Sequence, residues 1–181
     1  MDDEFLVRQI INGERAAFRL LVLRYQRPLF RFLGMLGHTP DAAEDLAQQT
    51  FLRVFRSLPA FDARQSRFST WLFTIARRLA ANERQRAHRR HEHDAPELEN
   101  ESPAAGVTAA DPAVTAELRR RLVAAIAALP AALRSTFILS EVTELSLDEV
   151  AALEGCALGT VKSRIHRARE HLRLALADEE S

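Results

Sequence analysis

Hydrophobic residues recur along the chain at intervals of three and four positions, the spacing that brings side chains onto one face of an α-helix. No stretch alternates hydrophobic and polar residues with the period of two that marks a half-buried strand. The pattern therefore predicts an all-α fold. In the first helical stretch the hydrophobic positions are Phe18, Leu21, Val22, Tyr25, Leu29, Phe32, Leu33 and Leu36.

Glycine, proline and capping residues separate the next helix from the first. Gly37 and Pro40 interrupt the first pattern, because both residue types disfavour a continuous helix. Asp41 is expected to cap the second helix, with Glu44 three residues later completing a capping-box-like pair. A Leu-Pro pair at 58–59 is predicted to end this helix.

A third helix is expected to start at Ser69 or Thr70, after the loop AFDARQSRF. At about 100° per residue, Arg77 and Arg84 lie opposite the hydrophobic stripe of this helix. These two arginines are therefore predicted to face solvent or a partner. The stripe itself consists of Phe68, Leu72, Ile75 and Leu79.

The C-terminal part has the element order of a helix-turn-helix. Ser146 and Glu149 match a capping box, and Gly155 can adopt the left-handed conformation that ends a helix. A basic helix follows, and in this motif the second helix enters the DNA major groove. An earlier helix is predicted from the stripe Leu118, Leu122, Ile126 and Leu129.

The basic stretch GTVKSRIHRARE, residues 159–170, divides into a buried and an open face. Helical geometry assigns to the buried stripe Val161, Ile165, Ala168 and Leu172. Left on the open face are Lys162, Ser163, His166 and Arg167. Lys, Arg and Ser are residue types that bind phosphates and base edges. An ordinary solvated amphipathic helix is the alternative interpretation.

Charge is unevenly distributed, although the chain of 181 residues has 25 basic and 25 acidic ones. Residues 64–91 contain eight arginines and one acid, whereas residues 92–117 contain seven acids, three prolines and no Lys or Arg. An acidic segment of this composition buries too little surface to order itself, so 92–117 is predicted to be a flexible linker. It joins two predicted small helical domains, 1–91 and 118–177, whose basic blocks suit a polyanionic partner.

Several functional classes find no support in the sequence. The longest nearly apolar run, 122–133, is far shorter than the roughly 20 residues of a membrane span, and the N-terminus is acidic where a secretion signal is basic. We therefore expect a cytoplasmic protein without membrane insertion. No phosphate-binding glycine loop or nucleophile elbow is present, so no enzyme, catalytic residue or cofactor is expected. A metal protein built on His88, His91 and His93 is the alternative, which loss of activity on chelation would support.

Residues 129–173 resemble region four of the extracytoplasmic-function sigma factors of bacterial RNA polymerase. The resemblance lies in a Leu-Pro pair, a helix, a Leu-Ser pair, GTVKSR and RAR, in this order. The N-terminal part resembles region two of the same family in AFRLLVLRY, DAAEDLAQQTFLRVF and FSTWLFTIARRLA. The two resemblances cover nearly the whole chain, in the order that the family has.

The resemblance implies a transcription initiation factor that binds core RNA polymerase, recognises promoter DNA with two domains and helps to melt it. Asp45, Gln48 and Gln49 share one helical face. They match the family's positions that dock on the clamp coiled coil of the largest polymerase subunit. Gln49 stands where the family usually has an acid, which removes one charge from this contact.

The loop AFDARQSRF resembles the element that captures a flipped base of the minus-ten element. The resemblance assigns to this pocket Phe61, Asp62, Arg64, Gln65 and Ser66, and to the phosphates of the melted strand Arg77, Arg78 and Arg84. Trp71, beside the hydrophobic stripe, is expected to pack in the core. Arg78 stands where the family often has Asn, a change that adds charge.

In the C-terminal part, the family's positions that contact the minus-thirty-five element match Lys162, Ser163, Arg164, His166 and Arg167. Ala157 occupies the usual Ser or Pro cap position of that helix, and losing a capping side chain costs about 1 kcal/mol. The family further implies an anti-sigma factor as a partner. It also implies a linker that threads the active-site and RNA-exit channel of the polymerase.

A helix-turn-helix repressor or response-regulator-type DNA-binding protein is the alternative function, in which only the C-terminal half acts. Such a protein would bind DNA without polymerase. It would leave the segments DAAEDLAQQTF and FSTWLFTIAR without a role. A gel shift with and without core polymerase separates the two hypotheses.

Overall fold

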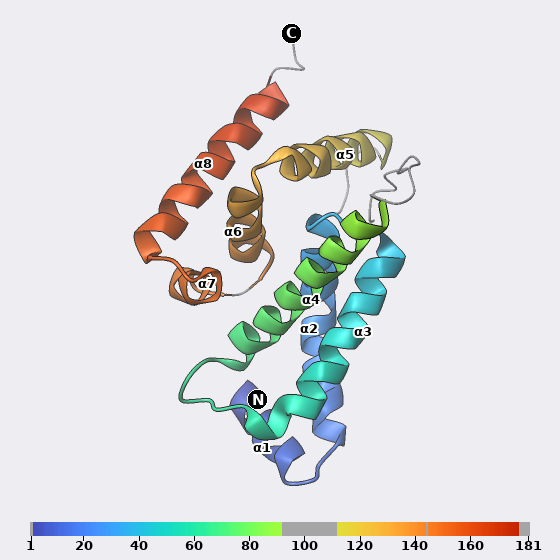
Figure 1. Cartoon of the computed structure of the whole chain (residues 1–181), viewed down its shortest axis with the longest axis vertical. Coiled ribbons are helices and arrows are strands. Elements are labelled where there is room, and N and C mark those ends of the chain that lie inside the picture. Colours follow the sequence, from blue (N-terminus) through green and yellow to red (C-terminus); the bar gives the residue numbers. More distant parts are fainter. Residues whose placement is uncertain (1, 92–111, 144, 178–181) are drawn as a thin grey trace. The chain divides into compact units, whose positions relative to one another are not determined.

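The structure, a computed structural model, describes residues 2–91, 112–143 and 145–177 (Figure 1). Helices and short connections account for these residues, with no strand among them, so the expected all-α fold is confirmed. They fall into two compact units, with most residues before 101 in one and most of the later residues in the other. The helices are α1 (Asp3–Ile11), α2 (Ala16–Met35), α3 (Pro40–Ser57), η1 (Leu58–Ala60), α4 (Phe68–His91), α5 (Pro112–Ala128), α6 (Ala131–Val142), α7 (Leu147–Glu154) and α8 (Leu158–Ala177).

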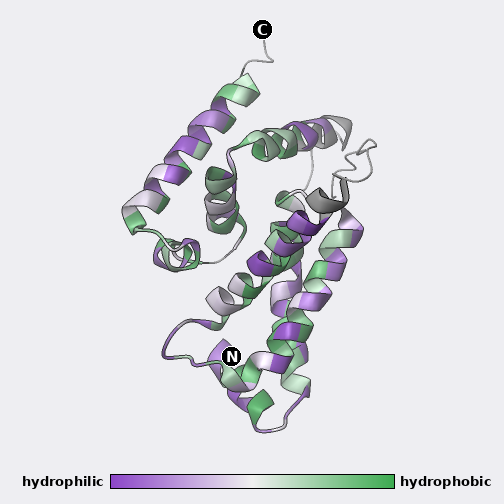
Figure 2. Cartoon of the chain, in the orientation of Figure 1, coloured by the Kyte–Doolittle hydropathy of each residue, from purple (hydrophilic) through white to green (hydrophobic). Residues whose placement is uncertain are grey.

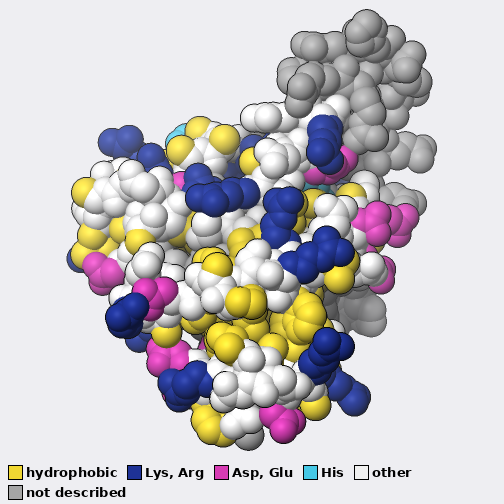
Figure 3. All heavy atoms as spheres, turned by 60° about the horizontal axis from the view of Figure 1, so that its bottom comes forward, with side chains coloured by type: hydrophobic (Ala, Val, Ile, Leu, Met, Phe, Trp, Pro, Cys, Tyr) yellow, Lys and Arg dark blue, Asp and Glu magenta, His cyan; other side chains and the backbone are white. Residues whose placement is uncertain are grey.

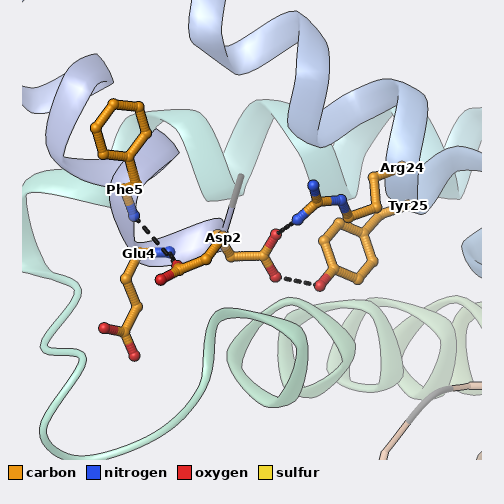
Figure 4. A network of polar contacts seen from close by, with 6 residues as sticks. Asp2, Glu4, Phe5, Arg24 and Tyr25 are labelled. Carbon is orange, nitrogen blue, oxygen red and sulfur yellow. Dashed lines mark hydrogen bonds and ion pairs between the residues drawn. The ribbon is translucent and has the colours of Figure 1, made fainter.

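The first helix, α1, was not expected from the sequence. The Asp2 side chain caps it by accepting hydrogen bonds from the backbone amides of Glu4 and Phe5, at 2.7 and 3.3 Å (Figure 4). Its buried side chains are Leu6, Val7 and Ile10. An Asp cap followed by apolar residues is a helix signal, but a helix of nine residues gives only a short periodic pattern.

Polar and aromatic contacts hold α1, α2 and α4 together. The Asp3 carboxylate accepts hydrogen bonds from the Arg24 guanidinium and the Tyr25 hydroxyl of α2 (Figure 4). The Tyr25 ring in turn packs against Phe68 of α4, with ring centroids 5.6 Å apart. Further ring pairs join α2 to α3 and α4, namely Phe18 with Phe51 and Phe55, and Phe32 with Phe73.

Two details of the first unit differ from the sequence-based expectation. Helix α3 begins at Pro40 rather than at an Asp41 cap, because proline suits the first helical position, where no backbone donor is needed. In α4 the stripe is rotated, since Ile75 and Leu79 are only half-buried. The buried hydrophobic residues among the described side chains of α4 are Phe68, Leu72, Phe73, Ala76 and Ala80.

In the second unit, α8 packs against α5, α6 and α7. The predicted capping box is present, because the Ser146 side chain accepts from the Glu149 amide while the Glu149 carboxylate accepts from the Ser146 amide. Gly155 ends α7 at φ 64° and ψ 37°, the left-handed conformation that glycine adopts without steric cost. Hydrophilic and hydrophobic colours alternate around the described helices in Figure 2, as expected of helices with one buried face.

The start of α5 differs from the prediction. The helix begins at Pro112, so the last residues of the predicted linker 92–117 are helical, while 92–111 lie outside the described residues. Only the second half of its predicted stripe is buried: Ile126 and Leu129 are in the core, whereas Leu118 and Leu122 are exposed. Helical spacing shows which residues share a face, but not whether another element covers it.

Candidate functional site

Helix α8 presents the open face that its sequence predicts. Its buried residues are Val161, Ile165, Ala168 and Leu172. Exposed on the other side are Lys162, Ser163, His166 and Arg167. Neither Lys162 nor Arg167 forms an ion pair with another described residue. Their charges are therefore available to an anionic partner.

The position of Arg164 differs from that of its four neighbours in the predicted set. Its guanidinium Nη1 lies 3.4 Å from a carboxylate oxygen of Glu154, and its side chain is 27% exposed. Nη1 also lies 3.8 Å from the sulfur of Cys156. Arg164 therefore faces the body of the unit rather than the open face of α8.

Two residues near the open face were not singled out from the sequence. Thr160 is exposed one turn before Ser163 and Arg164, and its hydroxyl is of a type that binds phosphates or bases. Glu170 is exposed one turn after His166, and its carboxylate accepts from Arg173 at 3.4 Å. An acid repels anions, so Glu170 makes this later turn of α8 less favourable for an anionic partner than the first turns. Ala157 precedes the helix and has no side-chain oxygen to cap it.

In the first unit, the loop before α4 is organised by Asp62. The Asp62 carboxylate accepts hydrogen bonds from the Arg64 amide and guanidinium, at 3.0 to 3.1 Å, and from the Gln65 amide group at 3.2 Å. Hydrogen bonds from the Arg64 side chain and backbone lower the pKa of Asp62 from 3.8 to about 2. The same contact raises the pKa of Arg64. Both charges of the pair are therefore kept at neutral pH.

An aromatic cluster supports this loop from beneath. The Phe61 ring lies against Phe68 and Trp71, with centroids 6.0 and 5.0 Å apart. Phe61 and Trp71 are half-buried, and Ser66 is half-buried at the end of the loop. Trp71 was expected in the core; it packs on Phe61 and Phe68 but stays half-buried. Five candidate residues of the loop, 61, 62, 64, 65 and 66, are brought together within one short turn.

The arginines of α4 differ in exposure. Arg78 and Arg84 are exposed, whereas Arg77 is half-buried and has contacts of its own. Arg86 lies 4.0 Å from Glu83, at the limit of an ion pair. The sequence placed Arg77 on the solvent side, and the rotated stripe of α4 explains its lower exposure.

Helix α3 exposes the polar face predicted from the sequence and two hydrophobic residues beside it. Asp45, Gln48 and Gln49 are exposed, with Gln48 donating to Glu44 at 3.4 Å. Leu52 lies one turn further along and Phe55 about two turns, 56% and 37% exposed. Exposed hydrophobic side chains next to polar ones are typical of protein-binding surfaces. Figure 3 shows that hydrophobic, basic and acidic side chains all reach the surface of the described residues.

Comparison with known proteins identifies the family of this chain. The family model for Sigma-70 region 2 matches residues 21–90, and that for Sigma-70, region 4 matches residues 119–172. The chain is 37% identical over 177 residues to the ECF RNA polymerase sigma-E factor of Salmonella typhimurium, covering 94% of this chain and 92% of that protein. This chain belongs to the extracytoplasmic-function sigma factors.

Further similar proteins are consistent with this family assignment. The RNA polymerase sigma-H factor of Pseudomonas aeruginosa is 33% identical over 181 residues, covering 96% of this chain and 93% of that one. A chain in the solved complex of the sigma factor RpoE with the anti-sigma factor NepR from Bartonella quintana is 26% identical in sequence to this chain. Its TM-score is 0.75, and the match covers 90% of this chain and 98% of that one. CnrH, solved with the cytosolic domain of CnrY, has the same fold, with a TM-score of 0.74 at 23% identity over 98% of both chains.

The match to region 2 also decides against the repressor hypothesis, because that hypothesis gave the N-terminal helices no role. Within the described residues, no group of three or more His, Cys, Asp or Glu side chains is arranged to hold a metal ion. His93 and the side chains of His88 and His91 are not among them. Among the helices described, none is both long enough and hydrophobic enough to cross a membrane.

Proposed function

We propose that this sigma factor starts transcription through three surfaces, one for core RNA polymerase and two for promoter DNA, with no catalytic step of its own. The observation that carries the proposal is that each matched region exposes its own polar surface, α3 and the 61–67 loop in one and α8 in the other. Both partners lie in the bacterial cytoplasm, where we place the protein.

The polymerase surface is formed by α3. Asp45, Gln48 and Gln49 supply its polar contacts, and Leu52 and Phe55 extend it with exposed hydrophobic area. Burial of such side chains supplies most of the affinity of protein interfaces, while polar groups fix the register. The two exposed hydrophobic residues offset the acid that is missing at Gln49.

The minus-ten surface is formed by the 61–67 loop and the exposed arginines of α4. The Asp62 hydrogen bonds hold the loop in one conformation before DNA arrives, which reduces the entropy lost on binding. Arg64 is left highly exposed beside it. Arg78 and Arg84 are placed to bind phosphates of the melted strand.

The minus-thirty-five surface is the open face of α8, with Lys162 and Arg167 as its charged contacts and Ser163 and His166 between them. The acidic charge of the linker, predicted as 92–117, suits the role that the resemblance implies, in which it threads the active-site and RNA-exit channel of the polymerase. We further propose that an anti-sigma factor holds this protein inactive, as the complex of RpoE with NepR supports.

Run-off transcription tests the proposal directly. Core RNA polymerase is incubated with fragmented G+C-rich bacterial DNA, with and without the full-length protein, and the transcript ends are sequenced. The proposal predicts new start sites that share two spaced upstream motifs. No new start sites, with core polymerase that responds normally to another sigma factor, would contradict it.

A further inference from the structure

A partly buried polar bridge joins three helices of the second unit. Glu154, the last residue of α7, has a side chain that is only 5% exposed. One of its carboxylate oxygens accepts a hydrogen bond of 2.7 Å from the Ser135 hydroxyl of α6. The other lies 3.4 Å from the Arg164 guanidinium of α8. The bridge therefore connects α8 to α6 and α7, two of the three helices against which it packs.

The electrostatics of this bridge oppose the separation of Arg164 from Glu154. A buried carboxylate is stable only when it is hydrogen-bonded and paired, because it has lost its hydration. Glu154 has both kinds of partner, a hydroxyl and a guanidinium. Moving Arg164 away would take a cation from a carboxylate that is 5% exposed, a change more costly than breaking an exposed ion pair.

Arg164 contrasts with the other cations of α8. Arg169 and Arg173 are also paired, but with Glu141 and Glu170, and in both pairs each side chain is well exposed. Lys162 and Arg167 are exposed without an ion pair to any described residue. Arg164 alone, of these five, is paired with a buried acid.

We infer that Glu154 is a positioning residue of the DNA-recognition helix, which holds Arg164 away from DNA and fixes the orientation of α8. The inference rests on the proposed use of α8 in promoter recognition. It assigns to the protein body a basic residue that lies within the DNA-contacting run GTVKSR. The exposed neighbours Lys162, Ser163, His166 and Arg167 remain free to meet the promoter.

This arrangement has a consequence for specificity. A free arginine at position 164 would add a phosphate contact that any DNA sequence can satisfy, and such contacts raise non-specific affinity. By retaining Arg164, Glu154 lowers non-specific binding without changing the base contacts. Neutralising Glu154 should therefore strengthen binding to unrelated DNA, whereas damage to the fold would weaken it.

The test measures how tightly holoenzyme, made from core polymerase and the full-length protein, binds two DNA duplexes at several salt concentrations. One duplex carries the promoter, and the other has a scrambled upstream element. The salt slope is the change in the logarithm of the binding constant with the logarithm of salt concentration.

Arg164→Gln keeps a hydrogen-bond donor for Glu154 and removes the charge, and it should leave the salt slope unchanged. Lys162→Ala is the matched control and should reduce the slope by about 1. Glu154→Gln should increase affinity for the scrambled duplex and steepen its slope. Adding Arg164→Gln to Glu154→Gln should abolish that gain.

An equal loss of slope in Arg164→Gln and Lys162→Ala would overturn the inference, because Arg164 would then contact phosphate in the wild-type protein. If a folded Glu154→Gln variant shows no increase in affinity for the scrambled duplex, Glu154 does not hold Arg164 away from DNA. Circular dichroism and thermal unfolding establish folding, and if Glu154→Gln does not fold, the Arg164→Gln comparison decides alone. If Lys162→Ala and Arg167→Ala both bind like wild type, the proposed DNA surface of α8 is wrong, and the inference fails with it.

Discussion

The carboxylate of Asp62 accepts hydrogen bonds from both the backbone amide and the guanidinium of Arg64, two residues further along the chain. One side chain thus fixes the turn of the 61–67 loop and the direction of its exposed arginine. A loop held this way resembles a preformed binding element more than a mobile connection.

Replacing Asp62 tests whether this order serves promoter use. We expect Asp62→Asn to reduce open-complex formation several-fold, because the neutral amide binds Arg64 more weakly than the carboxylate does. In the folded protein the pKa of Asp62 is about 2, below its ordinary value of 3.8. The ionised carboxylate therefore stabilises the folded loop fully at pH values above 3.8, and this stabilisation is lost as the pH falls toward 2. The effect of Asp62→Asn should therefore be constant across neutral pH. Permanganate footprinting of the melted strand measures it, and Asp148→Asn, in the other domain, is the control.

Leu52 tests the polymerase surface of α3. We expect Leu52→Ser to weaken binding to core polymerase by about 1 kcal/mol or more, roughly fivefold in affinity, since an exposed leucine is buried in the proposed complex. Leu23→Ser is the matched control, because Leu23 is exposed to a similar degree on α2. Fluorescence titration with labelled protein measures both. Equal losses, or none, would contradict the proposed surface.

Asp45→Ala probes the same surface through its charge. It should reduce affinity for core polymerase while leaving the transcription start sites unchanged, because Asp45 is not on either proposed DNA surface. A change in start-site selection at saturating sigma factor would be inconsistent with this role.

Arg167 and Lys162 should have different roles on α8. Arg167→Ala is expected to weaken use of the upstream element by about 1–3 kcal/mol and to relax sequence preference at one position. Lys162→Ala should weaken binding to all sequences alike. Transcription from a set of promoters with single substitutions in the upstream element distinguishes the two. Identical profiles for both variants would contradict the division.

Two glycines flanking the turn provide a test of the helix-turn-helix geometry. Gly155 has φ +64°, whereas Gly159 lies in α8 without a positive φ, and both have open space around the position of a Cβ. Gly155→Ala should lower the free energy of unfolding by about 1 kcal/mol, since alanine is strained in the left-handed region. Gly159→Ala should raise it by up to about 1 kcal/mol through helix propensity. Thermal unfolding followed by circular dichroism measures both, and a shift of the same sign would contradict the turn geometry.

Local chemistry made a large part of the second unit predictable. The Ser146–Glu149 capping box, the left-handed Gly155 and the buried stripe of α8 all occur as expected, because each depends on residues within one or two helical turns. The order of the two sigma regions was also readable from sequence, since their motifs are contiguous segments. The exposed face of α3 followed from the same periodicity.

Tertiary contacts decided the remaining features. The sequence by itself determined that α8 is a basic helix with one open face, because helical geometry fixes which side chains share a side. It did not determine that Arg164 turns toward Glu154, that Leu118 stays exposed or that the stripe of α4 is rotated. These depend on which residue of another helix lies within reach, and such partners are distant in sequence: Ser135 and Arg164 meet at Glu154 only after α6, α7 and α8 have packed together.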